Sequence, residues 1–190
     1  MSAPGRLIVV KVGGGLSAIP GALEVVGRAL AEAGRRHRLL VVPGGGPFAD
    51  AVRAFDRREG LSADAAHWMA ILAMDQYAYV LVERIPGAVL LDEPGTIGAV
   101  LGGTGVAVLA PSRWLRAADV LPHDWGATSD SAAAFVAGAL DAERLVLIKP
   151  EGGAAADQVD THFALVLPVG LPWSTLGWDE VGELEKLLDG

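Results

Sequence analysis

Short, nearly wholly apolar runs recur along the chain, and they are rich in Val, Ile and Leu. Such runs are typical of strands that a parallel sheet buries on both faces. The expected strands are Leu7–Val12, Leu39–Val42, Val89–Leu91, Val106–Leu109, Leu145–Ile148 and Leu165–Leu167.

Between these runs, apolar residues recur at helical spacing. Leu23, Val26 and Leu30, for example, share one face of the segment that follows the first strand. Pro47 suits the first position of a helix, and Ser62 can cap a longer one. The expected helices are 19–36, 47–58, 63–84, 129–140 and 179–188, while the glycine-rich stretch 94–103 predicts no element.

Strands that alternate with helices predict an α/β fold in which helices cover both faces of a mainly parallel sheet. The expected architecture is therefore a three-layer αβα sandwich. The chain has 190 residues, of which 52% are hydrophobic, and it contains no internal repeat or linker. We therefore expect a single domain, residues 1–190, with a full apolar core.

The charge balance and the cysteine count exclude several classes of function. The 23 acidic residues outnumber the 15 basic ones, and this balance argues against a nucleic-acid groove. The chain has no cysteine, so disulfides, zinc–thiolate sites and thiol catalysis are excluded. No apolar run reaches the roughly 18 residues of a membrane span. We expect a cytoplasmic protein without nucleic-acid or membrane partners.

Two glycine clusters directly follow the first two expected strands. Lys11 lies at the end of the first strand, before Gly13–Gly15, and Gly44–Gly46 follow the second. A lysine ammonium group and glycine backbone N–H groups can bind phosphate together at one edge of a parallel sheet. A glycine turn beside a solvated lysine is the alternative. Two such loops suit transfer of a phosphoryl group between two partners, although neither has the Walker spacing.

A third polar segment lies at the start of the expected helix 129–140. Helix capping explains one of Ser129, Asp130 and Ser131, but not all three. Asp130 can orient a lysine or a bound metal. His123, a few residues upstream, either donates to a phosphate or closes a turn.

Taken in order, these motifs resemble the amino acid kinase superfamily. They are Lys11–Gly14, the loop Gly44–Gly46, the segment Thr128–Ala133 and the strand that ends at Lys149. The superfamily includes acetylglutamate kinase, aspartokinase, uridylate kinase and isopentenyl phosphate kinase. The resemblance covers roughly residues 6–153, and the ordered set of motifs is specific although each piece alone is not.

The resemblance implies an ATP-dependent kinase with Mg²⁺ as its metal. Lys11 and Lys149 would neutralise charge on the transferring phosphoryl group, and Asp130 would hold both lysines in place. Phosphates would hold most of the Mg²⁺ coordination, with Asp130 as a candidate contact and no dedicated protein metal site. Gly14 and Gly45 would donate backbone N–H groups. The phosphate- and nucleotide-binding residues would be Gly13, Gly14, Gly15, Thr128, Ser129 and Ser131.

Three further stretches, 44–53, 62–75 and 122–131, are similar to the kinases of methanofuran synthesis, which phosphorylate an aminomethyl-furanyl-methyl phosphate. This similarity implies an acceptor site at Gly44–Gly46, His67, Asp75 and His123. His67 could instead pack at a core or subunit interface, and Asp75 could be solvated or act as a cap. The alternatives for function are a kinase of a nucleoside monophosphate or carboxylate, and a non-catalytic member that binds nucleotide or oxyanions for storage or sensing.

The chain departs from the superfamily after its fifth strand. Many relatives have an Asp-Gly turn there, whereas this chain has Pro150-Glu151-Gly152-Gly153 and then Ala154-Ala155-Ala156. The resemblance therefore implies a shortened C-terminal part with less of the expected adenine site. It also implies a homo-oligomer, because the long helix 63–84 carries more apolar surface than one core stripe needs.

Overall fold

The computed structural model describes residues 7–152 and 159–190 and has a six-stranded parallel sheet at its centre. Every neighbouring pair of strands runs in the same direction, in the order β3-β4-β2-β1-β5-β6. The strands are β1 (Leu7–Val12), β2 (Arg38–Pro43), β3 (Val89–Leu91), β4 (Gly105–Leu109), β5 (Arg144–Lys149) and β6 (Trp173–Gly177). The predicted α/β sandwich with a parallel sheet is confirmed.

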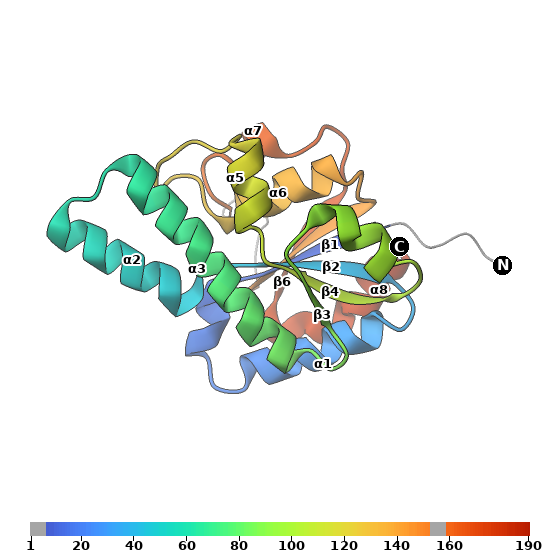
Figure 1. The fold of residues 1–190 in the computed structure, drawn as a ribbon. Coiled ribbons are helices and arrows are strands. Elements are labelled where there is room, and N and C mark those ends of the chain that lie inside the picture. Colours follow the sequence, from blue (N-terminus) through green and yellow to red (C-terminus); the bar gives the residue numbers. More distant parts are fainter. Residues whose placement is uncertain (1–6, 153–158) are drawn as a thin grey trace.

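Helices cover both faces of this sheet (Figure 1). On one face lie α1 (Ala22–Ala33), η4 (Trp178–Glu183) and α8 (Leu184–Asp189). On the other lie α4 (Ile97–Val100), α5 (Ser112–Ala118), α6 (Ser129–Ala139) and α7 (Phe163–Val166). The remaining helical segments are η1 (Gly14–Ala18), α2 (Gly46–Glu59), α3 (Ala63–Arg84) and η2 (Pro94–Thr96).

The alternation of side chains along β1 explains how one lysine comes to lie inside an apolar strand. Val10 and Val12 pack into the core layer of α1, whereas Val9 packs into the layer of α6. Since successive side chains of a strand point to opposite faces, Lys11 lies on the α6 side. Lys149 has the same parity as Leu147 on the neighbouring strand β5, so it also faces α6.

Helix α3 joins the two core layers. Ile71 and Met74 pack on the α6 side, whereas Tyr77 and Leu81 pack on the α1 side. Met69, on the same helix, is 36% exposed. Although α3 is 22 residues long, no helix in the described part of the chain is long and apolar enough to cross a membrane. The expected homo-oligomer stays a prediction.

The prediction fails most clearly near the C-terminus. The run Leu165–Leu167, expected as a strand, instead lies at the end of the short helix α7, and Leu165 is 79% exposed. The sixth strand is β6, which the sequence pattern missed. Its residues at the edge of the sheet are mostly half-buried and lack a continuous apolar run. Helix α5 was also missed.

The sheet topology brings the predicted motifs to one edge. Strand β1 pairs with β2 on one side and with β5 on the other. Strands β2 to β4 therefore extend the sheet from one side of β1, and β5 and β6 extend it from the other. Ligands of open α/β sheets bind beyond the carboxyl ends of the strands at such a switch point. Both glycine loops and both candidate lysines follow or end these three strands.

Candidate active site

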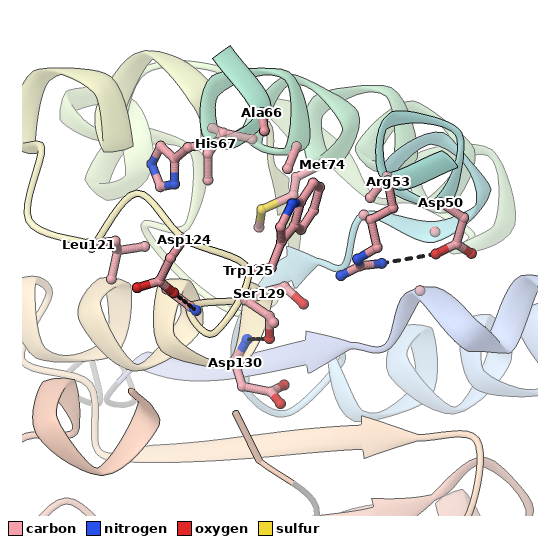
Figure 2. Close-up of a pocket in the computed structure, with 18 of the residues that line it drawn as sticks. Asp50, Arg53, Ala66, His67, Met74, Leu121, Asp124, Trp125, Ser129 and Asp130 are labelled. Atoms are coloured by element: carbon pink, nitrogen blue, oxygen red, sulfur yellow. Dashed lines mark hydrogen bonds and ion pairs between the residues drawn. The ribbon is translucent and has the colours of Figure 1, made fainter. Parts of the chain in front are cut away.

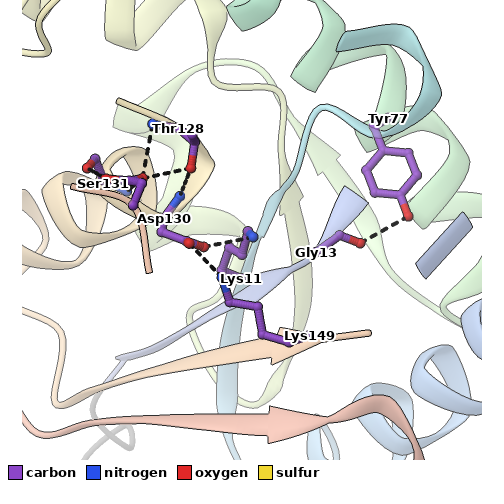
Figure 3. Close-up of polar contacts among 8 residues, drawn as sticks. Lys11, Gly13, Tyr77, Thr128, Asp130, Ser131 and Lys149 are labelled. Carbon is purple, nitrogen blue, oxygen red and sulfur yellow. Dashed lines mark hydrogen bonds and ion pairs between the residues drawn. The ribbon is translucent and has the colours of Figure 1, made fainter. Parts of the chain in front are cut away.

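Three charged side chains meet at this edge of the sheet. The Lys11 Nζ lies 2.8 Å from Asp130 Oδ1, and the Lys149 Nζ lies 2.6 Å from Asp130 Oδ2 (Figure 3). The side chains of Lys11, Lys149 and Asp130 are only 6%, 12% and 5% exposed. The structure therefore brings together the three residues predicted to be catalytic.

The cluster holds two ammonium groups and one carboxylate. Burial alone would raise the pKa of Asp130, but Lys11 and Lys149 outweigh it and hold that pKa below its usual range. Burial and the charge of Lys11 lower the pKa of Lys149, and the carboxylates of Asp130 and Asp160 offset this lowering only in part. The three groups carry a net charge of about +1, and an arriving anion would relieve the repulsion between the lysines.

A residue without a role in the sequence analysis fixes the helix start that carries Asp130. The Asp160 Oδ2 accepts hydrogen bonds from the N–H of Thr128 (3.0 Å), the hydroxyl of Thr128 (2.7 Å) and the N–H of Ser131 (3.0 Å). The Asp160 Oδ1 accepts from the Ser131 hydroxyl and from the N–H of His162 (3.1 Å). This carboxylate thus binds the first orphan donors of α6.

These bonds change the predicted roles of the α6 start. Ser131 is fully buried and bonded to Asp160, so it does not reach the pocket that was expected to hold phosphate. Thr128 lines the pocket, but its N–H and hydroxyl both donate to Asp160. Ser129 lines the pocket as predicted. The physical reason is that Asp160 already supplies the anion that this helix end favours.

The two glycine loops pack directly against each other. A side chain at Gly14 would overlap the backbone of Gly46, and one at Gly44 would overlap the backbone of Gly14. The N–H of Gly44 donates to Val12, and Gly44 does not line the pocket. Gly13 lines the pocket, although its own N–H donates to Ile148 (2.9 Å).

The pocket-facing glycines of these loops are Gly13, Gly14, Gly15, Gly45 and Gly46. Among them, Gly46 has a φ of 55°, which glycine adopts at little cost. Because these glycines have no side chains, a ligand can approach the backbone of both loops closely.

Tyr77 supports both loops from below. Its hydroxyl donates to the carbonyl of Gly13 at 3.4 Å, and its ring lies where a side chain at Gly46 would be. Burial raises the pKa of Tyr77 to about 12, so it stays a neutral donor. Tyr77 is thus a residue of the core and does not line the pocket.

A pocket of about 610 Å³ opens above the charged cluster and the glycines. Its volume lies in the range of small-ligand sites. Helices α2 and α3 form two walls, and the loop before α6 forms a third (Figure 2).

Three residues with polar or aromatic side chains line this pocket and contact one another: Arg53, Asp56 and Trp125. The Arg53 guanidinium lies 4.9 Å from the centroid of the Trp125 ring, and the Trp125 Nε1 donates to Asp56 (2.8 Å). Arg53 and Trp125 occur in stretches that resemble the methanofuran-branch kinases, although the sequence alone indicated no role for either residue.

The two predicted acceptor histidines line the pocket and stack on each other with ring centroids 4.1 Å apart. His123 uses both ring nitrogens, Nδ1 to Asp64 (2.6 Å) and Nε2 to Asp119 (2.9 Å). These two carboxylates raise the pKa of His123. Burial and His123 lower the pKa of His67. The nitrogens of His123 are thus engaged in joining the loop before α6 to helix α3, so they are not aimed at a phosphate.

Asp75 does not line the pocket, so its predicted contact with an acceptor amine is not supported by its position. It accepts hydrogen bonds from the N–H (2.9 Å) and the hydroxyl of Ser112, at the start of α5. This is the capping role that the sequence left open. Pro150 lines the pocket, whereas Gly153 and the alanines 154–156 lie outside the described residues.

The donor set fits a phosphate ligand better than a protein-held metal. The described residues contain no group of three His, Cys, Asp or Glu side chains placed to hold a metal ion. Both oxygens of Asp130 face lysines. Two buried ammonium groups beside glycine backbone suit phosphate oxygens. A Mg²⁺ ion would therefore be held mainly by the phosphates themselves.

Comparisons with known proteins agree with this geometry. A curated relative is [5-(aminomethyl)furan-3-yl]methyl phosphate kinase from Methanocaldococcus jannaschii, which is 29% identical over 139 residues. The match covers 73% of this chain and 63% of the relative, so the chain spans less than two thirds of that protein. Uridylate kinase from Archaeoglobus fulgidus has a similar structure, with a TM-score of 0.60, 20% identity, and coverage of 82% of this chain and 70% of that one.

The uridylate kinase likeness supports the fold. The family itself follows from a model of the amino acid kinase family, which matches residues 6–153 and so includes both glycine loops, Asp130 and Lys149. This chain therefore belongs to the amino acid kinase family.

Proposed function

We propose that this protein is an ATP-dependent kinase that transfers the γ-phosphoryl group to a small phosphorylated acceptor. The observation that carries the proposal is the buried Lys11–Asp130–Lys149 cluster at the floor of a glycine-walled pocket. Two buried ammonium groups beside glycine backbone at the floor of a pocket attract an anionic ligand. The terminal phosphate of ATP is such an anion.

The reaction asks these residues for positioning and charge neutralisation. The bond between the γ-phosphorus and the bridging oxygen of ATP breaks, and a bond to an acceptor phosphate oxygen forms, so that ADP leaves. Lys11 and Lys149 neutralise the charge that gathers on the transferring group, and Asp130 holds both ammonium groups in place. Mg²⁺ supplies further neutralisation on the phosphates. An acceptor phosphate is already ionised, so no general base is needed.

The acceptor we propose is an aminomethyl-furanyl-methyl phosphate, as in methanofuran-type cofactor synthesis. Support comes from the name of the curated relative and from a pocket with one wall of apolar side chains from α3. A nucleoside monophosphate or a carboxylate is the alternative acceptor. A non-catalytic protein that binds nucleotide or oxyanions is the alternative from another class.

Turnover with defined acceptors tests the proposal. The protein with MgATP and the furan phosphate should release ADP and form a diphosphate, which phosphorus NMR would detect. Uridine monophosphate and acetate serve as competing acceptors, and Lys11→Met serves as the inactive control. Binding of MgATP by calorimetry without turnover of any acceptor would favour the non-catalytic alternative, and absence of MgATP binding at millimolar concentration would refute the kinase.

A further inference from the structure

Charge is distributed unevenly along the depth of the pocket. The floor has the two ammonium groups of Lys11 and Lys149, which both contact Asp130. The outer part of the lining instead has three carboxylates, of Asp50, Asp56 and Asp124, against the single guanidinium of Arg53. A ligand with an anionic end and a cationic end matches this distribution.

The spacing of the walls indicates how such a ligand would lie. Along α2, Gly46, Asp50, Arg53 and Asp56 recur at helical intervals on the pocket side. At about 1.5 Å per residue, the helix rises about 15 Å from Gly46 to Asp56. The facing side of α3 presents the apolar residues Ala66, Ala70, Ile71 and Met74. If the phosphate of an acceptor lies at the glycines, the middle of the acceptor lies against apolar side chains and its far end lies near carboxylates.

Trp125 provides a flat surface in the middle zone. It lies in the loop before α6, is 36% exposed and lines the same pocket as Met74 (Figure 2). Asp56 fixes its ring through the indole N–H, and Arg53 lies 4.9 Å from the ring centroid. An indole held at its edge loses little side-chain entropy when a flat ring packs on it.

The three outer carboxylates differ in how far they are already engaged. Asp56 uses one oxygen for Trp125 and the other for the N–H of Leu61. Asp50 is ion-paired with Arg53 at 2.9 Å, and its side chain is 73% exposed.

Asp124 has a different environment. Its Oδ1 accepts from the N–H groups of Gly126 (2.7 Å) and Ala127 (3.1 Å), with His162 Nε2 at 3.4 Å, while its Oδ2 makes no hydrogen bond within the described residues. The backbone therefore fixes this carboxylate and leaves one oxygen available for a ligand.

We propose that Trp125 and Asp124 determine acceptor specificity. The acceptor class is a phosphate monoester that carries a small aromatic ring with a protonated amine. The ring packs on the indole of Trp125, and the ammonium group pairs with Asp124 Oδ2. This inference rests on the proposed function, since it assigns the acceptor end of the same pocket.

The test compares two acceptors that differ only in the amine: aminomethyl-furanyl-methyl phosphate and its analogue with methyl in place of aminomethyl. Wild type should prefer the amine about 5- to 20-fold in kcat/KM, as expected for a partly exposed, charge-assisted hydrogen bond. Asp124→Asn should lose most of this preference, because the amide oxygen keeps the bonds to Gly126 and Ala127 while the charge is removed. The matched control Asp50→Asn should retain the preference.

The role of Trp125 is tested with the same pair of acceptors. Trp125→Leu should raise KM for both acceptors by about 3- to 10-fold, and Trp125→Phe should raise it less, because a ring remains for stacking. Equal effects of the two variants would refute the role of the indole as a ring platform.

Calorimetric binding of both acceptors separates this inference from the proposed function. Turnover without a preference for the amine would overturn the inference and leave the kinase intact. An amine preference in binding that depends on Asp124, without any turnover, would refute the kinase and keep the inference. Loss of the preference in Asp50→Asn rather than in Asp124→Asn would overturn the assignment to Asp124.

Discussion

Replacement of Lys149 by methionine should separate stability from turnover. In wild type, Lys11 and Lys149 share the carboxylate of Asp130 at 2.8 and 2.6 Å. The variant keeps one buried ammonium group and one buried carboxylate, which form a neutral pair. It also removes the repulsion and burial that lower the pKa of Lys149. Methionine has a similar length and tolerates irregular surroundings.

The structure sets the size and the sign of both effects. We expect the free energy of unfolding of Lys149→Met to be within about 1 kcal/mol of wild type, or higher, since replacing a buried charge by an apolar group is often neutral or stabilising when no partner is stranded. Asp130→Asn should instead cost about 3–5 kcal/mol, because both ammonium groups lose the carboxylate that they contact. Turnover of Lys149→Met should fall about 10²–10³-fold, as when one preorganised charge at a reacting group is removed.

Urea unfolding followed by circular dichroism would give the three free energies, provided that the m-values agree. The values of kcat would come from ADP release at saturating MgATP and acceptor. The affinity for MgATP should change less than kcat, because the lysine matters most when charge gathers in the transition state.

Two results would refute this reasoning. A Lys149→Met variant destabilised as strongly as Asp130→Asn would mean that the cluster needs both lysines for folding. Unchanged kcat in a folded Lys149→Met variant would remove Lys149 from the reacting phosphoryl group.

Three further predictions follow from the same contacts. The affinity for MgADP, measured by calorimetry from pH 7 to 10, should fall as pH rises through the lowered pKa of Lys149, below its ordinary 10.5, because the anion binds the charged form; a flat profile contradicts this. In an NMR titration, His123 should titrate above 6.5 and His67 below it, so the stability that His123 contributes is fully present below pH 6.5 and is lost as pH rises through its raised pKa; the reverse order contradicts the structure. Asp160→Asn should lower the free energy of unfolding by about 1–3 kcal/mol and slow turnover although Asp160 does not line the pocket, and wild-type kcat in this variant would show that Asp130 keeps its position without it.

The parts of the site that the sequence predicted are those that depend on neighbouring residues. A lysine in an apolar strand, with glycines directly after it, indicates an anion site because every step concerns adjacent positions. Parallel pairing of β1 with β2 then places the Gly13–Gly15 and Gly44–Gly46 loops at one edge without further information. Lys149, by contrast, was expected only from the resemblance to the kinase superfamily, and the pairing of β5 with β1 places it at the same edge.

The residues that the sequence missed depend on contacts between distant segments. Asp160 lies 29 residues after Ser131, yet its carboxylate binds the start of the helix that Ser131 belongs to. Trp125 meets Asp56 across 69 residues, and no local pattern encodes that contact. Asp75 illustrates the converse case: the sequence left both a contact with the acceptor and a capping role open, and the structure shows that it caps a neighbouring helix.

The charge imbalance at the floor of the pocket connects the fold to the proposed chemistry. A strand at the centre of a sheet gains stability from apolar side chains, and Lys11 replaces one of them with a charged side chain that is only 6% exposed. Asp130 contacts this charge, and Lys149 brings a second ammonium group to the same carboxylate from the neighbouring strand. Selection for stability alone would favour a neutral pair or an apolar side chain there. A second lysine contributes to function where an anion binds the cluster. Negative charge on a transferring phosphoryl group gathers in the transition state, and this is the charge that the lysine would neutralise.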